Sequence, residues 1–244
     1  MIMLEDLQLA AKVHYSFLPD DYEDDRLNIA VTLLPLHPIG GDYCSVIPLA
    51  GERILVCLCD AVGHDVAAAL FAARINTYVL THARADLIPC DLVTGLNAYL
   101  CRHLAETGMY ATFYALLLDF EAGTMTLSGA AHPPVLQFQK DQNSCKEWSS
   151  MTTFLGIDDP MPLLCGSECL QLNRGDRFLL YSDGLIEVED ADFQAFGTEG
   201  LSSALMTHQN LSGQELNKAI LTQAEVYADE GFKDDVLLVS ITLK

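Results

Sequence analysis

Short connections between strand-like segments restrict the fold of this 244-residue chain more than any other feature. Only "AGE" separates "DYCSVIPL", which begins at Asp42, from "RILVCLC", which ends at Cys59. Such a link turns a strand back beside its neighbour, whereas a parallel crossover needs about a dozen residues or more. The two strands are therefore predicted to pair antiparallel.

The second half of the chain repeats this organisation. "YATFYALLLDF", "MTLSGA" and "PVLQFQ" follow one another through short turns and predict a β-meander. Helical spacing of apolar residues predicts helices over Leu4–Phe17, Asp65–Ala83, Asp91–Ala105, 199–208 and 212–229, and further strands are predicted over Leu27–Leu34, "DRFLLYSDG" and "DVLLVSITL". Residues 140–168 contain two prolines and two glycines, and we interpret them as a surface loop or flap. Strands in meanders with helices grouped between them indicate an α+β layered fold.

Composition excludes several classes of function. Apolar residues make up 50% of the chain, which is ample for a sizeable core. The net charge of −21, from 34 acidic and 13 basic residues, disfavours binding to nucleic acid or to an anionic membrane surface. No apolar run approaches the ~20 residues of a membrane span, and the first twenty residues lack the pattern of a secretion signal. A cytoplasmic location is therefore expected.

The eight cysteines do not have the spacing of a zinc site. Cys57 and Cys59 are two apart in an apolar strand, Cys165 and Cys169 are four apart, and no pair of C-x-x-C motifs exists. Reduced, mostly buried thiols are the expected state. A phosphatase of the cysteine-nucleophile type is also disfavoured, because no cysteine has an arginine six positions later.

Four aspartates stand where an apolar strand meets a turn. Asp42 opens one strand, Asp60 closes "ILVCLC", Asp183 closes "RFLLYS", and Asp234 opens "DDVLLVSITL". For each acid alone, a turn or helix-cap role is the usual explanation. Four acids in one context favour another role, because carboxylates that converge repel one another unless protons or cations neutralise them.

Magnesium and manganese are the natural partners of such a carboxylate group, because these cations prefer oxygen ligands. The small residues Ala61 and Gly184 follow two of the acids and would let the backbone approach a metal. Paired metals can activate a water molecule for attack on phosphorus, a reaction that needs no protein nucleophile.

Six motifs carry a resemblance to a known family. "IGGDYCSV", "CDAVGHDVAAAL", "YATFYALLLD", "LSGAAHPPVL", "GDRFLLYSDGLIEVED" and "KDDVLLVSI" occur in the order and spacing of the SpoIIE/RsbU-like branch of the PPM superfamily. This superfamily contains the type 2C metal-dependent Ser/Thr protein phosphatases. The resemblance implies an αββα sandwich of two antiparallel β-sheets flanked by helices. It also implies an N-terminal helix or linker over residues 1–20 and a single phosphatase domain over 21–244.

The resemblance further implies a centre of two or three Mn²⁺ or Mg²⁺ ions. By motif, Asp60 would bridge the metals, the Ala61 carbonyl would serve one of them, and Asp183 and Asp234 would complete the other site. Asp42 would bind directly or through water. Asp60 and Asp183 are the expected catalytic residues, in a hydrolysis of phosphoserine or phosphothreonine by a metal-activated water.

The partners implied by the resemblance belong to signal transduction. The expected substrate is a phosphorylated STAS-domain anti-sigma-factor antagonist or a similar protein, which would link the chain to stress response and sigma-factor regulation. An upstream sensory or receiver domain and a homodimer are further implied partners.

Departures from the family pattern leave an alternative open. Asp65 stands where the family usually has glycine, and it would act as a helix N-cap, as an added metal ligand or as a disturbance of the site. A PPM-like adaptor or sensor with weak or no activity is therefore the second hypothesis. Hydrolysis of a nucleotide is disfavoured, because no Walker-type loop is present.

Several neighbouring residues receive structural interpretations. His64 and His132 are expected to pack or hydrogen-bond rather than to act in catalysis. Asp235 competes with Asp234 for the proposed metal role, since the two are adjacent. Glu187, four residues after Asp183, would support the site or belong to the surface.

Overall fold

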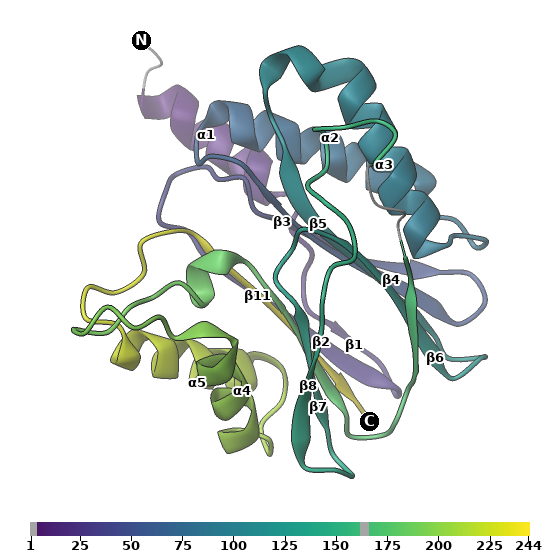
Figure 1. Cartoon of the computed structure of the whole chain (residues 1–244), viewed down its shortest axis with the longest axis vertical. Coiled ribbons are helices and arrows are strands. Elements are labelled where there is room, and N and C mark those ends of the chain that lie inside the picture. The colour runs from purple at the N-terminus through teal and green to yellow at the C-terminus, as the bar shows by residue number, and fades with distance from the viewer. Residues whose placement is uncertain (1–3, 162–165) are drawn as a thin grey trace. The chain divides into compact units, whose positions relative to one another are not determined.

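The computed structural model describes residues 4–161 and 166–244, which form two compact units (Figure 1). The first unit comprises Met1–Pro19, His37–His132 and Ser149–Leu172, and the second comprises Asp20–Leu36, Pro133–Trp148 and Asn173–Lys244. The chain passes between them several times, so each unit is assembled from segments that are distant in sequence. Each contains one antiparallel sheet and its own helices.

The sheet of the first unit has the strand order β3-β4-β5-β6-β9. Its strands are β3 (Tyr43–Leu49), β4 (Arg53–Ala61), β5 (Ala111–Asp119), β6 (Thr124–Ala130) and β9 (Glu168–Gln171), all paired antiparallel. The predicted reversal at "AGE" is confirmed, and Gly51 and Glu52 make it with positive φ angles of 77° and 54°. The strand that ends in Asp60 is thereby hydrogen-bonded on both edges, by β3 and by β5.

Helices cover one face of this sheet. The first unit contains α1 (Leu4–Tyr15), α2 (Val66–His82), α3 (Pro89–Leu104) and the short 3₁₀ helix η1 (Ala105–Thr107). Leu55 and Cys57 of β4 share a core with Phe71 and Ile75 of α2 and with Leu96 of α3. Each such fully buried leucine, isoleucine or phenylalanine contributes about 1.5–3 kcal/mol of hydrophobic stabilisation.

The third helix begins two residues earlier than the sequence indicated. Pro89 takes the first helical position, where its missing N–H costs nothing and its fixed φ suits the helix.

The sheet of the second unit has the strand order β1-β2-β11-β10-β7-β8. Its strands are β1 (Tyr22–Glu23), β2 (Leu27–Leu34), β7 (Val135–Gln139), β8 (Ser144–Trp148), β10 (Arg177–Tyr181) and β11 (Val236–Leu243). The 3₁₀ helix η2 (Asp183–Leu185) follows β10, and α4 (Gly197–Thr207) and α5 (Gly213–Tyr227) pack on one face of the sheet through a core that includes Leu179, Leu216 and Leu238.

The expected fold class, α+β with two antiparallel sheets flanked by helices, is confirmed. The interpretation of residues 140–168 as a loop is wrong for Ser144–Trp148, which form β8 and pair with β7. This strand lies at a sheet edge and is mostly half-exposed, so it lacks the apolar alternation that marks a strand in sequence. Pro162 and Cys165, within the same interval, lie outside the described residues.

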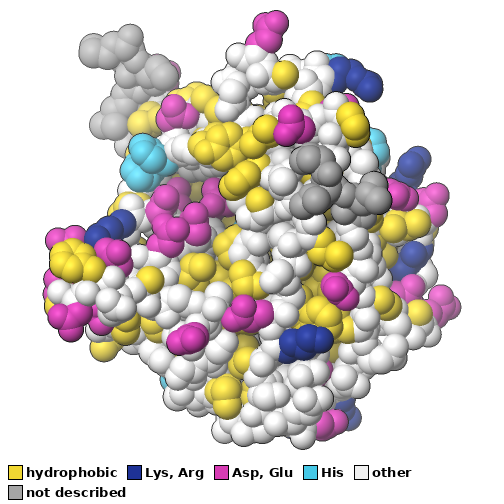
Figure 2. Space-filling model, viewed as in Figure 1, with side chains coloured by type: hydrophobic (Ala, Val, Ile, Leu, Met, Phe, Trp, Pro, Cys, Tyr) yellow, Lys and Arg dark blue, Asp and Glu magenta, His cyan; other side chains and the backbone are white. Residues whose placement is uncertain are grey.

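Acidic side chains greatly outnumber basic ones on the face drawn in Figure 2, as the net charge of −21 requires. Among the described residues, every helix is too short or too polar to cross a bilayer. In the described part of the chain, seven cysteines are free thiols, of which Cys44, Cys57 and Cys59 are buried and Cys169 is exposed.

A buried asparagine ties α5 to the sheet of the second unit. Asn217 is fully buried, and its Nδ2 lies 3.2 Å from the Ala30 carbonyl oxygen and 3.0 Å from Thr32 Oγ1. Asn217→Ala should lower the free energy of unfolding by about 1–3 kcal/mol, because buried acceptors lose their donor. Urea unfolding followed by circular dichroism measures this. The matched control is Thr222→Ala, an exposed position of the same helix, which should change the free energy by no more than about 0.5 kcal/mol. Equal losses in the two variants would contradict the role of Asn217.

Candidate functional site

Two of the predicted acids lie opposite each other in the first unit. The register pairs Tyr43 of β3 with Cys59 of β4, so the next pair along the ladder is Asp42 and Asp60. The ladder continues past them, because the Ala61 N–H donates to the Gly41 carbonyl at 3.4 Å. Residues directly opposite in an antiparallel pair project from the same face of the sheet, about 5 Å apart at Cβ. Asp42 is 6% exposed and Asp60 is half-buried.

Gly41 allows the backbone before β3 to lie in close contact with the backbone at the end of β4. A Cβ placed on Gly41 would collide with the Ala61 carbonyl oxygen and would lie 3.0 Å from the Gly63 carbonyl oxygen. Only a residue without a side chain fits there. The Ala61 carbonyl, which the family resemblance assigns to a metal, is therefore beside Asp42 and Asp60.

The thiols near these acids are not nucleophiles. Burial raises the pKa of Cys57 to about 12. The pKa of Cys59 is also well above its ordinary value, first because of burial and then because Asp60 and Asp42 repel a thiolate. Both side chains stay protonated at neutral pH, so the expected reduced and inert state is supported for β4.

Asp65 caps the helix that follows the site. Its Oδ1 accepts from the N–H groups of Ala67 at 2.9 Å and of Ala68 at 3.1 Å, and its backbone is extended, as an N-cap requires. Of the three roles that the sequence left open for Asp65, the structure supports helix capping. The carboxylate also lies at the positive end of the α2 dipole, which favours its charge.

His64 stacks on a residue that the sequence did not identify. The ring of His37 lies parallel to that of His64, with centroids 4.0 Å apart and an angle of 8° between the planes. His37 comes from the turn before β3, and no spacing or motif links it to His64 in sequence. His64 is exposed and His37 is half-buried, so the stacked pair lies at the protein surface, next to Gly63.

His132 has the structural role expected from the sequence. It is 4% exposed, and its Nδ1 lies 2.7 Å from Thr112 Oγ1. Thr112 is the residue of β5 that pairs with Asp60. His132 therefore helps to hold the strand beside the end of β4.

In the second unit, Asp183 follows a firmly anchored strand end. Ser182, just before it, donates its N–H to the Leu237 carbonyl, and its Oγ accepts from the Leu237 N–H, both at 2.9 Å. The Asp183 carbonyl then accepts from the N–H groups of Ile186 and Glu187, which closes η2. These bonds fix Asp183, which is half-buried, at the point where β10 meets β11.

Gly184 has the same function here that Gly41 has in the first unit. A Cβ on Gly184 would collide with the Asp235 carbonyl oxygen and would lie 3.3 Å from the Asp234 Cβ. The turn after β10 therefore lies directly against the residues before β11. This contact brings Asp183 and Asp234 together from positions 51 apart in sequence.

The structure also distinguishes the two adjacent acids before β11. Asp235 is 6% exposed, and its Oδ1 accepts from the Leu36 N–H at 2.5 Å. Asp234 is exposed, and its Oδ1 accepts from the Asp235 N–H at 2.7 Å. Asp235 therefore anchors β11, whereas Asp234 presents an accessible carboxylate.

The charges of Asp183 and Asp234 affect the pKa of Glu187. Its pKa is raised, first by burial of the carboxyl and then by repulsion from Asp183 and from Asp234. The second unit thus holds several carboxylates close enough to disfavour one another's charge, which is the situation that bound cations relieve.

Two antiparallel sheets whose strand ends carry such carboxylates correspond to the PP2C class of phosphatase folds. The sequence model of the SpoIIE family, described as stage II sporulation protein E, matches residues 50–244. The chain therefore belongs to the SpoIIE family.

Solved structures show the same fold. The SiaA PP2C domain of Pseudomonas aeruginosa superposes with a TM-score of 0.84 at 18% identity, over 98% of this chain and 96% of that chain. The RsbU and RsbW domains of a Mycobacterium tuberculosis protein give a TM-score of 0.74 at 23% identity, over 90% and 60%. RsbX in complex with magnesium gives 0.70 at 17% identity, over 92% and 98%. At these identities the similarity shows a shared fold.

The capping role of Asp65 predicts a specific pattern of variants. Asp65→Ala should lower the free energy of unfolding by about 1 kcal/mol, and Asp65→Asn should retain most of that stability, because asparagine caps a helix as well as aspartate. Urea unfolding measures both. Calorimetric titration with Mn²⁺ should give the same affinity for Asp65→Asn as for the unchanged chain. If Asp65→Asn lost as much affinity as Asp60→Asn, Asp65 would be a metal ligand.

Proposed function

We propose that this chain is a Mg²⁺- or Mn²⁺-dependent phosphatase that hydrolyses phosphoserine or phosphothreonine in a signalling protein. The observation that carries the proposal is the placement of Asp42 opposite Asp60 at the end of β4, in a chain of the SpoIIE family. Two carboxylates held this close by backbone pairing need a cation or a proton between them.

The residues present fit such cations. The donors are carboxylate and carbonyl oxygens, which Mg²⁺ and Mn²⁺ prefer over nitrogen or sulfur. The glycine positions Gly41 and Gly184 keep side chains out of the space beside these oxygens. In the first unit, Asp60, the Ala61 carbonyl and Asp42 would hold a metal ion, and in the second unit Asp183 and Asp234 would hold a metal ion. The magnesium in the RsbX structure supports this assignment by analogy of fold.

Bound cations would supply a water of lowered pKa and would neutralise the negative charge of the phosphoryl group. The protein's contribution is rigidity. Asp60 is fixed by pairing on both sides of β4, and Asp183 is fixed by the Ser182–Leu237 hydrogen bonds. Because the neighbouring thiols are protonated, the chain offers no cysteine nucleophile at this strand end, and hydrolysis by water is the reaction that the residues support.

The proposed substrate is a phosphorylated STAS-domain protein, such as an anti-sigma-factor antagonist. The support is the family and the similarity to a structure that contains RsbU and RsbW domains. An upstream sensory or receiver domain and a homodimer remain part of this proposal, with the cytoplasm as the compartment.

The second candidate is a PPM-like adaptor or sensor without turnover. It was suggested by Asp65, which departs from the family pattern and caps α2.

Hydrolysis of p-nitrophenyl phosphate and of a phosphothreonine peptide tests the proposal. Activity should require Mn²⁺ or Mg²⁺ and disappear with chelator. Asp60→Asn and Asp183→Asn should each lower kcat/KM by about a hundredfold or more, because metal ions contribute several kcal/mol to such reactions.

The matched control is Asp119→Asn. Asp119 ends β5 and pairs with Arg53, at the opposite end of β4 from Asp60. This variant should keep its activity. Turnover that persists in chelator and in the Asp60→Asn and Asp183→Asn variants would refute the metal mechanism, and metal binding without any turnover would favour the adaptor.

A further inference from the structure

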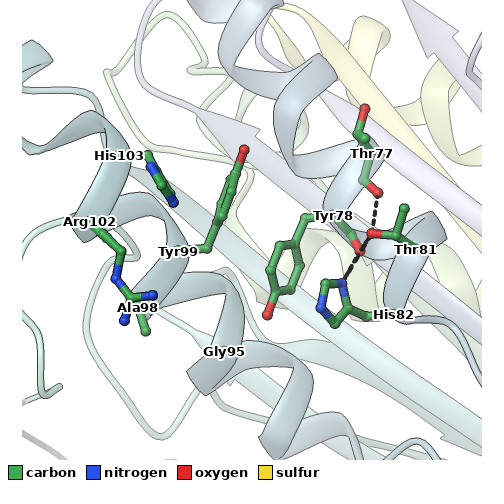
Figure 3. Close-up of a pocket in the computed structure, with 9 residues that line it drawn as sticks. All are labelled: Thr77, Tyr78, Thr81, His82, Gly95, Ala98, Tyr99, Arg102 and His103. Carbon is green, nitrogen blue, oxygen red and sulfur yellow. Dashed lines mark hydrogen bonds between the residues drawn. The ribbon is translucent and has the colours of Figure 1, made fainter.

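A cleft on the first unit lies well away from the strand-end acids. Nine residues of α2 and α3 line it and enclose about 390 Å³ (Figure 3). The lining begins at Thr77, and α2 begins at Val66, next to the cap Asp65. At the rise of an α-helix, Thr77 is about 16 Å along the axis from that start. The cleft is therefore a separate feature of the surface.

The charge of the lining is the reverse of the charge of the protein. None of the nine residues is acidic, although the chain has 34 acids and only 13 lysines and arginines. Three of them, His82, Arg102 and His103, are basic. Arg102 is exposed, and its guanidinium makes no hydrogen bond or ion pair with any residue in the described part of the chain. A guanidinium with all its donors available suits an anion.

Four rings form a row that positions the basic groups. The centroid of His103 lies 5.0 Å from that of Tyr99, Tyr99 lies 5.1 Å from Tyr78, and Tyr78 lies 3.9 Å from His82. Figure 3 shows this row crossing from α3 to α2. Arg74 donates two hydrogen bonds to Tyr99 Oη, at 2.7 and 3.1 Å, and so fixes the centre of the row.

His82 is held in one orientation. Its Nδ1 lies 2.8 Å from the Tyr78 carbonyl oxygen. A carbonyl oxygen only accepts, so Nδ1 carries the hydrogen. The other ring nitrogen, Nε2, is then the one that can contact a ligand.

Gly95 makes room for the cleft within a helix. A Cβ at Gly95 would lie 2.5 Å from Tyr78 Oη. A glycine inside a helix costs about 1 kcal/mol relative to alanine, and here it allows the phenol to lie against α3. In Figure 3 the Tyr78 hydroxyl and the Arg102 guanidinium both extend toward the stretch of α3 at Gly95 and Ala98. Burial raises the pKa of Tyr78, so its hydroxyl remains a neutral donor.

We propose that this cleft binds a small molecule carrying a phosphate monoester. The Arg102 guanidinium offers charge-assisted hydrogen bonds to the phosphate, and the Tyr78 hydroxyl adds a donor. The volume lies in the range of small-molecule sites.

The test uses phenyl phosphate as the probe and the full chain, stripped of metal and then freed of chelator, so that no turnover occurs. Proton–nitrogen correlation spectra of the histidine side chains should show saturable shifts of His82 and His103. Arg102→Gln should weaken the binding by about tenfold or more. The matched control is Arg84→Gln, which removes the same charge from an exposed position just after α2, outside the cleft, and should bind as the unchanged chain does.

A second variant tests the shape of the cleft. Gly95→Ala should displace Tyr78 and weaken the binding while His82 and His103 remain present. Equal weakening by Arg84→Gln and Arg102→Gln would reduce the effect to general electrostatics and overturn the proposal. Equal affinity for benzoate, preference for an acidic peptide, or the absence of saturable shifts at tens of millimolar probe would also overturn it.

Discussion

Repulsion between carboxylates held on neighbouring strands is the constraint on which this structure depends. The pairing of β3 with β4 leaves Asp42 and Asp60 opposite each other at the end of a strand whose interior is fully buried. The backbone of both acids is held by the ladder, which continues beyond them to Gly41 and Ala61. The burial of Leu55, Cys57 and their neighbours holds the strands in register against this repulsion. A bound cation would turn the same arrangement into a favourable one.

In both units, a glycine allows two backbone segments to lie in close contact next to an acidic residue. In each, a turn next to an acidic residue lies so close to the neighbouring backbone that only glycine fits, Gly41 against Ala61 and Gly184 against Asp235. The carbonyl oxygens of Ala61 and Asp235 therefore lie directly against glycine backbone. The result is a hard, oxygen-rich environment in a chain of the SpoIIE family, consistent with the chemistry proposed for it.

The second helix separates two electrostatic environments. Its first turn is capped by the carboxylate of Asp65, close to the acids of β4, and its last turns carry Tyr78 and His82 toward Arg102. The ligand proposed for that cleft would carry the charge opposite to that of the cations proposed at the strand ends. The helix α2, which packs on β4 through Phe71 and Ile75, therefore joins the region of the β4 acids to the cleft.

The sequence by itself determined most of the strands, their antiparallel pairing and the position of each candidate acid at a strand end, because short links and local periodicity encode these features. It could not show β8, whose edge position removes the apolar alternation, or the stacking of His37 on His64. The tertiary structure alone decided that Asp65 caps a helix, that Asp235 anchors β11 while Asp234 stays accessible, and that Gly95 makes room for Tyr78. These outcomes depend on which distant atom approaches a side chain, and no local pattern of residues contains that information.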